Sequence, residues 1–147
     1  IALIKEDSEG RWLAYPSTPT LKLDREWVKA LGWSGVTLSD AYPAISKLRV
    51  DMRAVYRAEP LFIGGIFILE ENSQLSLSSP LSAADAYIEI LRYTHTVRWL
   101  SAGGMAMKHM DYGRALQSTV PIFKLQYPKR LDIYDRVLDA LDEVFSD

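Results

Sequence analysis

Four basic residues between positions 47 and 57 are the side chains of this sequence best suited to binding an anion. Lys47, Arg49, Arg53 and Arg57 follow one another at intervals of two to four residues. The planar guanidinium of arginine can donate two parallel hydrogen bonds to phosphate or carboxylate oxygens, so this group indicates recognition of such a ligand. The alternative is ordinary surface charge, because charged residues make up 24% of the chain, which is the average for globular proteins.

Other motifs that could carry chemistry are less specific. His95 and His109 lie on separate predicted helices, and a metal site requires three or four converging ligands. The stretch GGMAMKHM (103–110) could bind phosphate at the start of a helix. No strand is predicted directly before it, so we interpret it as a turn between helices followed by core methionines. The sequence contains no GxxxxGK[ST], GxGxxG or HExxH motif.

Length and composition exclude several classes of protein. A chain of 147 residues with 48% hydrophobic residues can bury the core of one domain. The net charge of -2 argues against a nucleic-acid partner. Without cysteine there can be no disulfide, thiolate zinc site or cysteine nucleophile, which suits a cytoplasmic protein. The longest apolar run, residues 61–69, is too short to cross a membrane.

The first half of the chain is predicted to be rich in β-structure. Residues 1–6 and 11–15 should form a hairpin around the turn 7–10, and residues 20–23 a short strand. Asp24 should then cap a short helix whose carboxyl end is marked by Gly32. Because the periodicity weakens beyond residue 34, the segment 40–60 is expected to be irregular, with at most one short helix.

The second half is predicted to alternate strands and helices. Residues 61–71 should form a central strand that is apolar on both faces, with Gly64 and Gly65 at a bulge or a close approach of another backbone. A short strand (75–78), a long helix capped by Ser82, a second helix ending at Val120–Pro121 and a strand (122–128) should follow. The inward residues of the long helix should be Ala84, Tyr87, Ile88 and Leu91, and those of a last amphipathic helix Leu131, Tyr134, Leu138, Leu141 and Phe145.

This order of elements predicts an α/β fold with a mixed sheet and C-terminal helices. Residues 1–147 should form a single domain or half-domain. A strand at residues 1–4 would lack a neighbouring strand on one edge. A strand at 61–69 that is apolar on both faces would need a larger sheet around it than these residues can form. We therefore expect the chain to be part of a longer protein, and residues 1–147 alone to fold poorly or aggregate.

Several stretches, in this order, resemble the C-terminal half of the HPr kinase-like family of P-loop serine kinases. They are IALI…YPSTPTLKL, KLRV, PLFIGGIFILEE, LSAADAYIEILRYTH and HMDYGRALQSTVPIFKLQYP, and together they span essentially all of the chain. The small members that phosphorylate modified peptides, including the lasso-peptide kinases, are the most similar. The resemblance implies the continuation of a P-loop kinase core whose nucleotide-binding half, with its phosphate loop and acidic pair, would lie before Ile1.

The resemblance implies an ATP-dependent kinase that phosphorylates a Ser/Thr-type hydroxyl of a peptide or small protein, with a ribosomally made modified peptide as the preferred substrate. ATP and magnesium would be bound mainly by the missing N-terminal half, so this chain alone should not bind ATP. Lys22, Lys47 and Arg49 would bind phosphate or an acidic peptide terminus, while Arg53 and Arg57 should be solvated. His109 matches a recurrent family position and is the catalytic candidate; its alternative is a structural histidine beside methionines.

Two other functions remain open at this stage. The first is a non-catalytic module that binds a peptide or partner and lacks the phosphate loop. The second is a phosphorylase or hydrolase built on the same scaffold. The sequence does not identify the peptide, the acceptor residue or the oligomeric state, and it leaves a homo-oligomer open. A phosphate-loop motif and an acidic pair encoded before Ile1 would favour the kinase.

Overall fold

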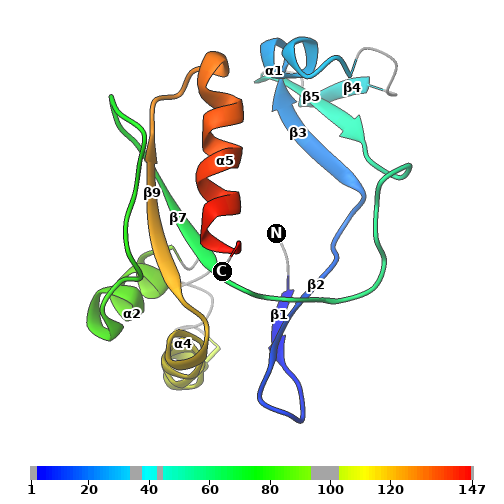
Figure 1. The fold of residues 1–147 in the computed structure, drawn as a ribbon. Helices are drawn as coiled ribbons and strands as arrows, with labels where there is room; N and C mark the ends of the chain where they lie inside the picture. The colour runs from blue at the N-terminus through cyan, green and yellow to red at the C-terminus, as the bar shows by residue number, and fades with distance from the viewer. Residues whose placement is uncertain (1–2, 34–37, 43–44, 94–102, 147) are drawn as a thin grey trace. The chain divides into compact units, whose positions relative to one another are not determined.

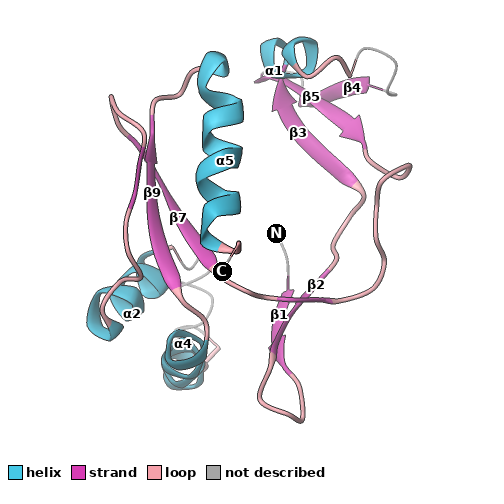
Figure 2. Cartoon of the chain, viewed as in Figure 1, coloured by secondary structure: helices cyan, strands magenta, loops and turns pink. Residues whose placement is uncertain are grey.

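The structure is a computed structural model of the chain and describes residues 3–33, 38–42, 45–93 and 103–146. The chain divides into two compact units. Unit 1 comprises Ile1–Lys5 and Leu13–Leu61, and unit 2 comprises Glu6–Trp12 and Phe62–Asp147. The predicted mixed α/β class is confirmed, with sheets followed by C-terminal helices (Figures 1 and 2). The prediction of a single domain or half-domain stays a prediction.

The strands β1 (Leu3–Glu6) and β2 (Trp12–Tyr15) are joined by the predicted turn. They form one sheet with the two-residue strand β6 (Leu61–Phe62), in the order β1-β2-β6. In the turn, the Gly10 amide donates to the Asp7 carbonyl oxygen at 3.2 Å, and the φ of Gly10 is 78°. That left-handed conformation is the reason why glycine suits this position.

Unit 1 contains a three-stranded antiparallel sheet with the order β3-β5-β4, and the helix α1 lies beside it (Figure 1). The bounds are Thr20–Asp24 for β3, Arg25–Ala30 for α1, Leu38–Tyr42 for β4 and Ile45–Asp51 for β5. Asp24 is the N-cap of α1 as predicted, although its carboxylate makes no capping hydrogen bond. Val28 of α1 packs with Leu48 and Val50 of β5 to form the core of this unit.

The prediction that residues 40–60 are irregular is wrong for β4 and β5, whereas residues 52–60 form no helix or strand, as expected. The strand β5 occupies Ile45–Asp51 and is the central strand of its sheet. Residues 47–51, KLRVD, alternate polar and apolar side chains, which is the pattern of a strand with one buried face. This alternation covers only five residues, so it is a weak signal in the sequence.

Unit 2 contains a mixed sheet with the order β7-β9-β8, in which β7 and β9 run parallel and β8 is antiparallel to β9. The bounds are Ile66–Glu71 for β7, Ser76–Leu77 for β8 and Ile122–Tyr127 for β9. Its helices are α2 (Ala83–Arg92), α4 (Ala106–Thr119), the 3-10 turn η1 (Leu131–Ile133) and α5 (Tyr134–Val144). Two parallel strands joined through helices form an α/β unit.

Helices cover both faces of this sheet. On one face, Ile68 of β7 and Ile122 of β9 pack against Ala86 of α2. On the other face, the ring of Phe67 stacks on Phe123 with centroids 5.1 Å apart and meets the edge of Phe145, just beyond α5, at 6.0 Å. Figure 1 shows α5 beside β7 and β9. The buried core therefore lies on both sides of β9.

The predicted strand 61–71 is divided, and its expected central position is wrong. Residues 63–65 separate β6 from β7, and β9 is the central strand of the described sheet. Side chains rather than another backbone approach Gly65, because a Cβ there would lie 3.3 Å from ring atoms of both Phe123 and Phe145. Leu69 of β7 is 54% exposed, so this strand is not buried on both faces.

The two predicted helix faces are corrected in part. In α2 the buried residues are Ala86 and Glu89, whereas Ile88 is 59% exposed. The N-cap at Ser82 is confirmed, because its hydroxyl accepts from the Asp85 amide at 3.2 Å. The α2 helix ends at Arg92, and residues 94–102 lie outside the described part of the chain.

On the last helix segment three predicted inward residues stay partly exposed, namely Tyr134, Leu138 and Phe145. None of the described helices is long and apolar enough to cross a membrane.

Candidate functional site

The strand β5 presents predicted site residues on one face and core residues on the other. Leu48 and Val50 are buried against α1, with 8% and 0% of their surface exposed. Lys47 and Arg49 alternate with them and are exposed. Because successive side chains of a strand point to opposite faces, burial of the apolar pair directs Lys47 and Arg49 to the solvent side of this sheet.

The neighbouring strands add to the same face. In the antiparallel register Lys22 of β3 is opposite Arg49, and Ser39 of β4 is opposite Arg49 on its other side. Lys47 is opposite Asp24. The structure therefore brings together the three predicted anion-binding residues, Lys22, Lys47 and Arg49, and we call their surface the basic face.

A cavity of about 330 Å³ opens at the basic face. It is lined by Pro19, Thr20, Ser39, Arg49, Asp51 and Arg53. We call it the β5 pocket. Its two hydroxyl side chains and two guanidinium groups are all hydrogen-bond donors. The lining therefore suits a ligand with several acceptor oxygens, such as a phosphate or a carboxylate.

One of the two arginines in the β5 pocket is paired. Arg53 Nε donates to both oxygens of the Asp51 carboxylate, at 3.0 Å to Oδ1 and 2.8 Å to Oδ2, and its NH2 group completes the ion pair. These hydrogen bonds, together with one from the Arg53 amide, lower the pKa of Asp51 from 3.8 to about 2. Asp51 is therefore charged at neutral pH and compensates Arg53.

Arg49 carries the charge of the β5 pocket that is available to a ligand. Within the described residues its side chain forms no hydrogen bond or ion pair. Arg53 and Arg57 are exposed as expected, with 77% of the Arg53 side chain accessible. Sequence reasoning missed that Arg53 also lines the pocket. The strand β5 ends at Asp51, and the chain beyond that end brings Arg53 beside Arg49.

His109 belongs to a different unit from the basic face. It lies on α4 in unit 2 and is half-buried, whereas Lys22, Lys47 and Arg49 belong to unit 1. Its catalytic role stays a prediction. The second histidine, His95, lies outside the described residues. In the part of the chain that the structure describes, no group of three or more His, Asp or Glu side chains could hold a metal ion.

A charged cluster in unit 2 was missed by sequence reasoning. Lys124 Nζ of β9 lies 3.0 Å from Glu70 Oε1 of β7 and 3.2 Å from Glu89 Oε1 of α2. The hydrogen bond to Glu70 is the largest cause that raises the pKa of Lys124. The cluster joins two strands and a helix across one face of the sheet, which is the arrangement of a structural ion pair. The sequence feature that could have indicated the cluster is Glu89, which occupies a buried position of α2 and was not part of the predicted apolar stripe.

Comparison of the chain with protein-family models, with curated proteins and with solved structures finds no match in any of the three.

Proposed function

We propose that the intact protein is an ATP-dependent kinase that phosphorylates a hydroxyl group of a peptide or small protein. The observation that carries the proposal is the basic face, where Lys22, Lys47 and Arg49 lie on adjacent strands and Arg49 opens into a pocket lined by donors. The resemblance of the sequence to the C-terminal half of HPr kinase-like enzymes supports it. A ribosomally made modified peptide is the proposed substrate.

The proposed contribution of this chain is positive charge. Phosphoryl transfer depends mainly on positioning and on stabilising the negative charge of the transferring group. The basic face would hold either the phosphates or an acidic group of the peptide. The described residues do not fit a magnesium site, since no carboxylate cluster is present among them. ATP and magnesium would be bound by the N-terminal half of the kinase core.

The test is phosphorylation by the full-length protein. Candidate peptides are incubated with the protein, ATP and magnesium, and mass spectrometry detects an added phosphate on the peptide. Arg57→Ala is the matched control for Arg49→Ala, because Arg57 is an exposed arginine of the same unit that does not line the β5 pocket. Phosphate transfer that depends on Arg49 and not on Arg57 supports the proposal. No transfer to any peptide, or equal rates in both variants, contradicts it.

The second candidate is a non-catalytic module that binds an acidic peptide. It is favoured by the β5 pocket itself, which is formed by residues of this chain alone and needs no phosphate loop. Peptide binding that is saturable and lost in Arg49→Ala, without phosphate transfer by the full-length protein, would establish this function in place of the kinase.

A further inference from the structure

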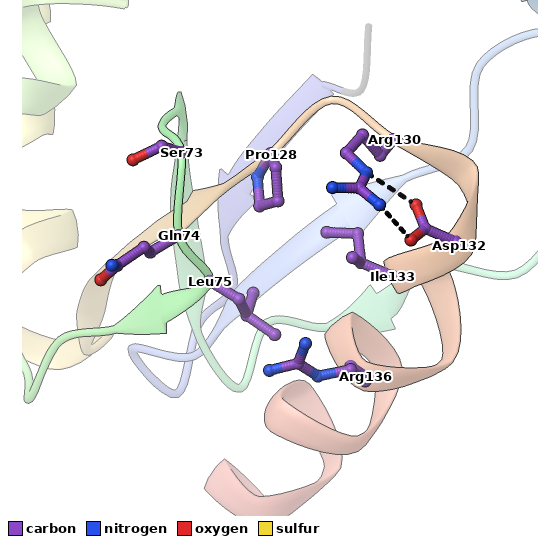
Figure 3. Close-up of a pocket in the computed structure, with 8 residues that line it drawn as sticks. All are labelled: Ser73, Gln74, Leu75, Pro128, Arg130, Asp132, Ile133 and Arg136. Atoms are coloured by element: carbon purple, nitrogen blue, oxygen red, sulfur yellow. Dashed lines mark hydrogen bonds and ion pairs between the residues drawn. The ribbon is translucent and has the colours of Figure 1, made fainter.

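Unit 2 has a cavity at the carboxyl ends of its two parallel strands. The cavity has a volume of about 380 Å³. Its walls come from the segment after β7 (Ser73, Gln74 and Leu75), from the segment after β9 (Pro128 and Arg130), and from η1 and α5 (Asp132, Ile133 and Arg136) (Figure 3). We call it the strand-end pocket. In α/β sheets, ligands bind in the crevice outside the carboxyl ends of the strands.

The strand-end pocket carries one compensated and one available arginine. Arg130 Nε and NH2 donate to the two oxygens of Asp132, at 2.9 Å and 2.6 Å. Arg136 forms no hydrogen bond or ion pair with another described residue, although its charge also acts on Asp132 at longer range and helps to lower the pKa of that carboxyl. Figure 3 shows its guanidinium extending towards Leu75, on the opposite wall. The two guanidinium groups and the one carboxylate together leave a single positive charge in the pocket.

The remaining walls limit the kind of ligand. The side chains of Ser73 and Gln74 point away from the arginines in Figure 3, while Leu75, Pro128 and Ile133 present apolar surface. The volume lies in the range of small-molecule sites, which is about 300–1,000 Å³, and exceeds what a bare inorganic ion fills. A ligand that fits has an oxyanion for the guanidinium and an apolar portion for the opposite wall.

We propose that the strand-end pocket binds a small organic oxyanion, a phosphate or carboxylate ester or acid with an apolar portion, through the bidentate fork of Arg136. Arginine is suited to this role because its two parallel N–H donors match the oxygens of either group. Asp132 limits the affinity for the ligand, because its carboxylate accepts the hydrogen bonds of the Arg130 guanidinium. The site lies in unit 2 and does not depend on the kinase proposal, which rests on residues of unit 1.

The experiment measures binding of phenyl phosphate and of benzoate to the intact protein by NMR at constant ionic strength. The two probes share the ring and differ in the oxyanion, so they distinguish a phosphate site from a carboxylate site. We expect saturable shifts of the amides of residues 73–75 and 130–136 with at least one probe. Arg136→Ala should weaken this binding at least tenfold, since a charge-assisted bidentate contact is lost.

Two variants distinguish the bidentate hydrogen bonding of the Arg136 guanidinium from the effect of its positive charge. Arg136→Lys keeps the charge and loses the planar fork, and it should still weaken binding severalfold. Lys129→Ala is the matched control, because Lys129 is an exposed cation of the same segment that does not line the pocket. Its effect should stay within about twofold. Shifts spread over all basic surfaces, or equal weakening by Arg136→Lys and Lys129→Ala, would overturn the proposal, and unchanged spectra of the unliganded variants confirm that they are folded.

Discussion

The β5 pocket of unit 1 and the strand-end pocket of unit 2 share a pattern of charges but are built differently. Each contains an arginine and an aspartate two residues apart that form an ion pair, namely Arg53 with Asp51 and Arg130 with Asp132. Each also contains a second arginine, Arg49 or Arg136, without an ion pair among the described residues. The β5 pocket stands on one face of an antiparallel sheet, whereas the other is closed by two loops and a helix.

The comparison shows how far each pocket is formed by residues that are close to one another in the sequence. The charge of the β5 pocket comes from Arg49, Asp51 and Arg53, which are close in sequence. Strand periodicity places Arg49 and Asp51 on one face of β5, and the turn after the strand brings Arg53 to them. The strand-end pocket combines segments more than 50 residues apart, as the hydrogen bond of Asn72 N to Tyr127 O at 2.9 Å beside it illustrates. Its geometry depends on the parallel pairing of β7 with β9.

The largest expected effect is on the scaffold of the strand-end pocket. Leu125 of β9 is 1% exposed, and Leu125→Ala should lower the free energy of unfolding by roughly 2–5 kcal/mol, because it leaves a cavity in the core. Leu69→Ala is the matched control, since Leu69 is the register partner of Leu125 on β7 and is 54% exposed. Its cost should be below about 1 kcal/mol. Urea denaturation measures both, and equal costs would contradict the assigned burial.

The next effect concerns turnover at the β5 pocket. If the kinase proposal holds, Arg49→Ala should slow peptide phosphorylation by roughly 30- to 1000-fold, as for a lost donor to a transferring oxyanion. Lys22→Ala and Lys47→Ala should fall in the same range, whereas Arg57→Ala should stay within about threefold. Rates are compared for full-length variants whose folding is checked by circular dichroism. If Arg57→Ala slows phosphorylation and Arg49→Ala does not, the site does not lie on the basic face.

The two aspartates should differ in titration. Both have a pKa lowered by side-chain hydrogen bonds from an arginine, and that of Asp51, which also accepts from the Arg53 amide at 3.0 Å, falls to about 2. A lowered pKa adds stability that is present above pH 4 and is lost as the pH falls from about 4 to about 2. Carboxyl NMR titration should find Asp51 protonating at lower pH than Asp132.

Removing Arg53 is the control for that titration. In Arg53→Gln the pKa of Asp51 should return towards 3.8, because the side-chain hydrogen bond from Arg53 is its largest cause. The pKa of Asp132, which is lowered chiefly by Arg130, should not change. A pKa of Asp51 near 2 in the variant would show that the ion pair is not its cause.

The smallest effect is expected from releasing the paired arginines. Asp51→Asn and Asp132→Asn remove the carboxylates that hold Arg53 and Arg130, so each should tighten oxyanion binding to its own pocket. Both ion pairs are exposed, and exposed pairs contribute little, so the gain should be about two- to fivefold. Phenyl phosphate titrations followed by NMR measure it, and weaker binding in either variant would show that the aspartate orients its arginine for the ligand instead of competing with it.

The sequence by itself determined the elements with strong local signals. The hairpin turn ending at Gly10, the caps Asp24 and Ser82, and the break at Val120–Pro121 all lie where they were predicted, because capping and backbone conformation depend on a few neighbouring residues. Residue type indicates Lys47 and Arg49, together with Arg53 and Arg57, as anion-binding candidates, whereas Lys22 was added by the resemblance to the kinase family.

The tertiary structure alone decided which of these residues meet. It made β5 a central strand, set Lys22 opposite Arg49, and placed His109 in the other unit. It also joined Lys124 to Glu70 and Glu89, and Arg136 to the segments that follow β7 and β9. The physical reason is that strand pairing and burial act between segments far apart in the chain, so the partners of a side chain depend on register and packing rather than on its neighbours in sequence.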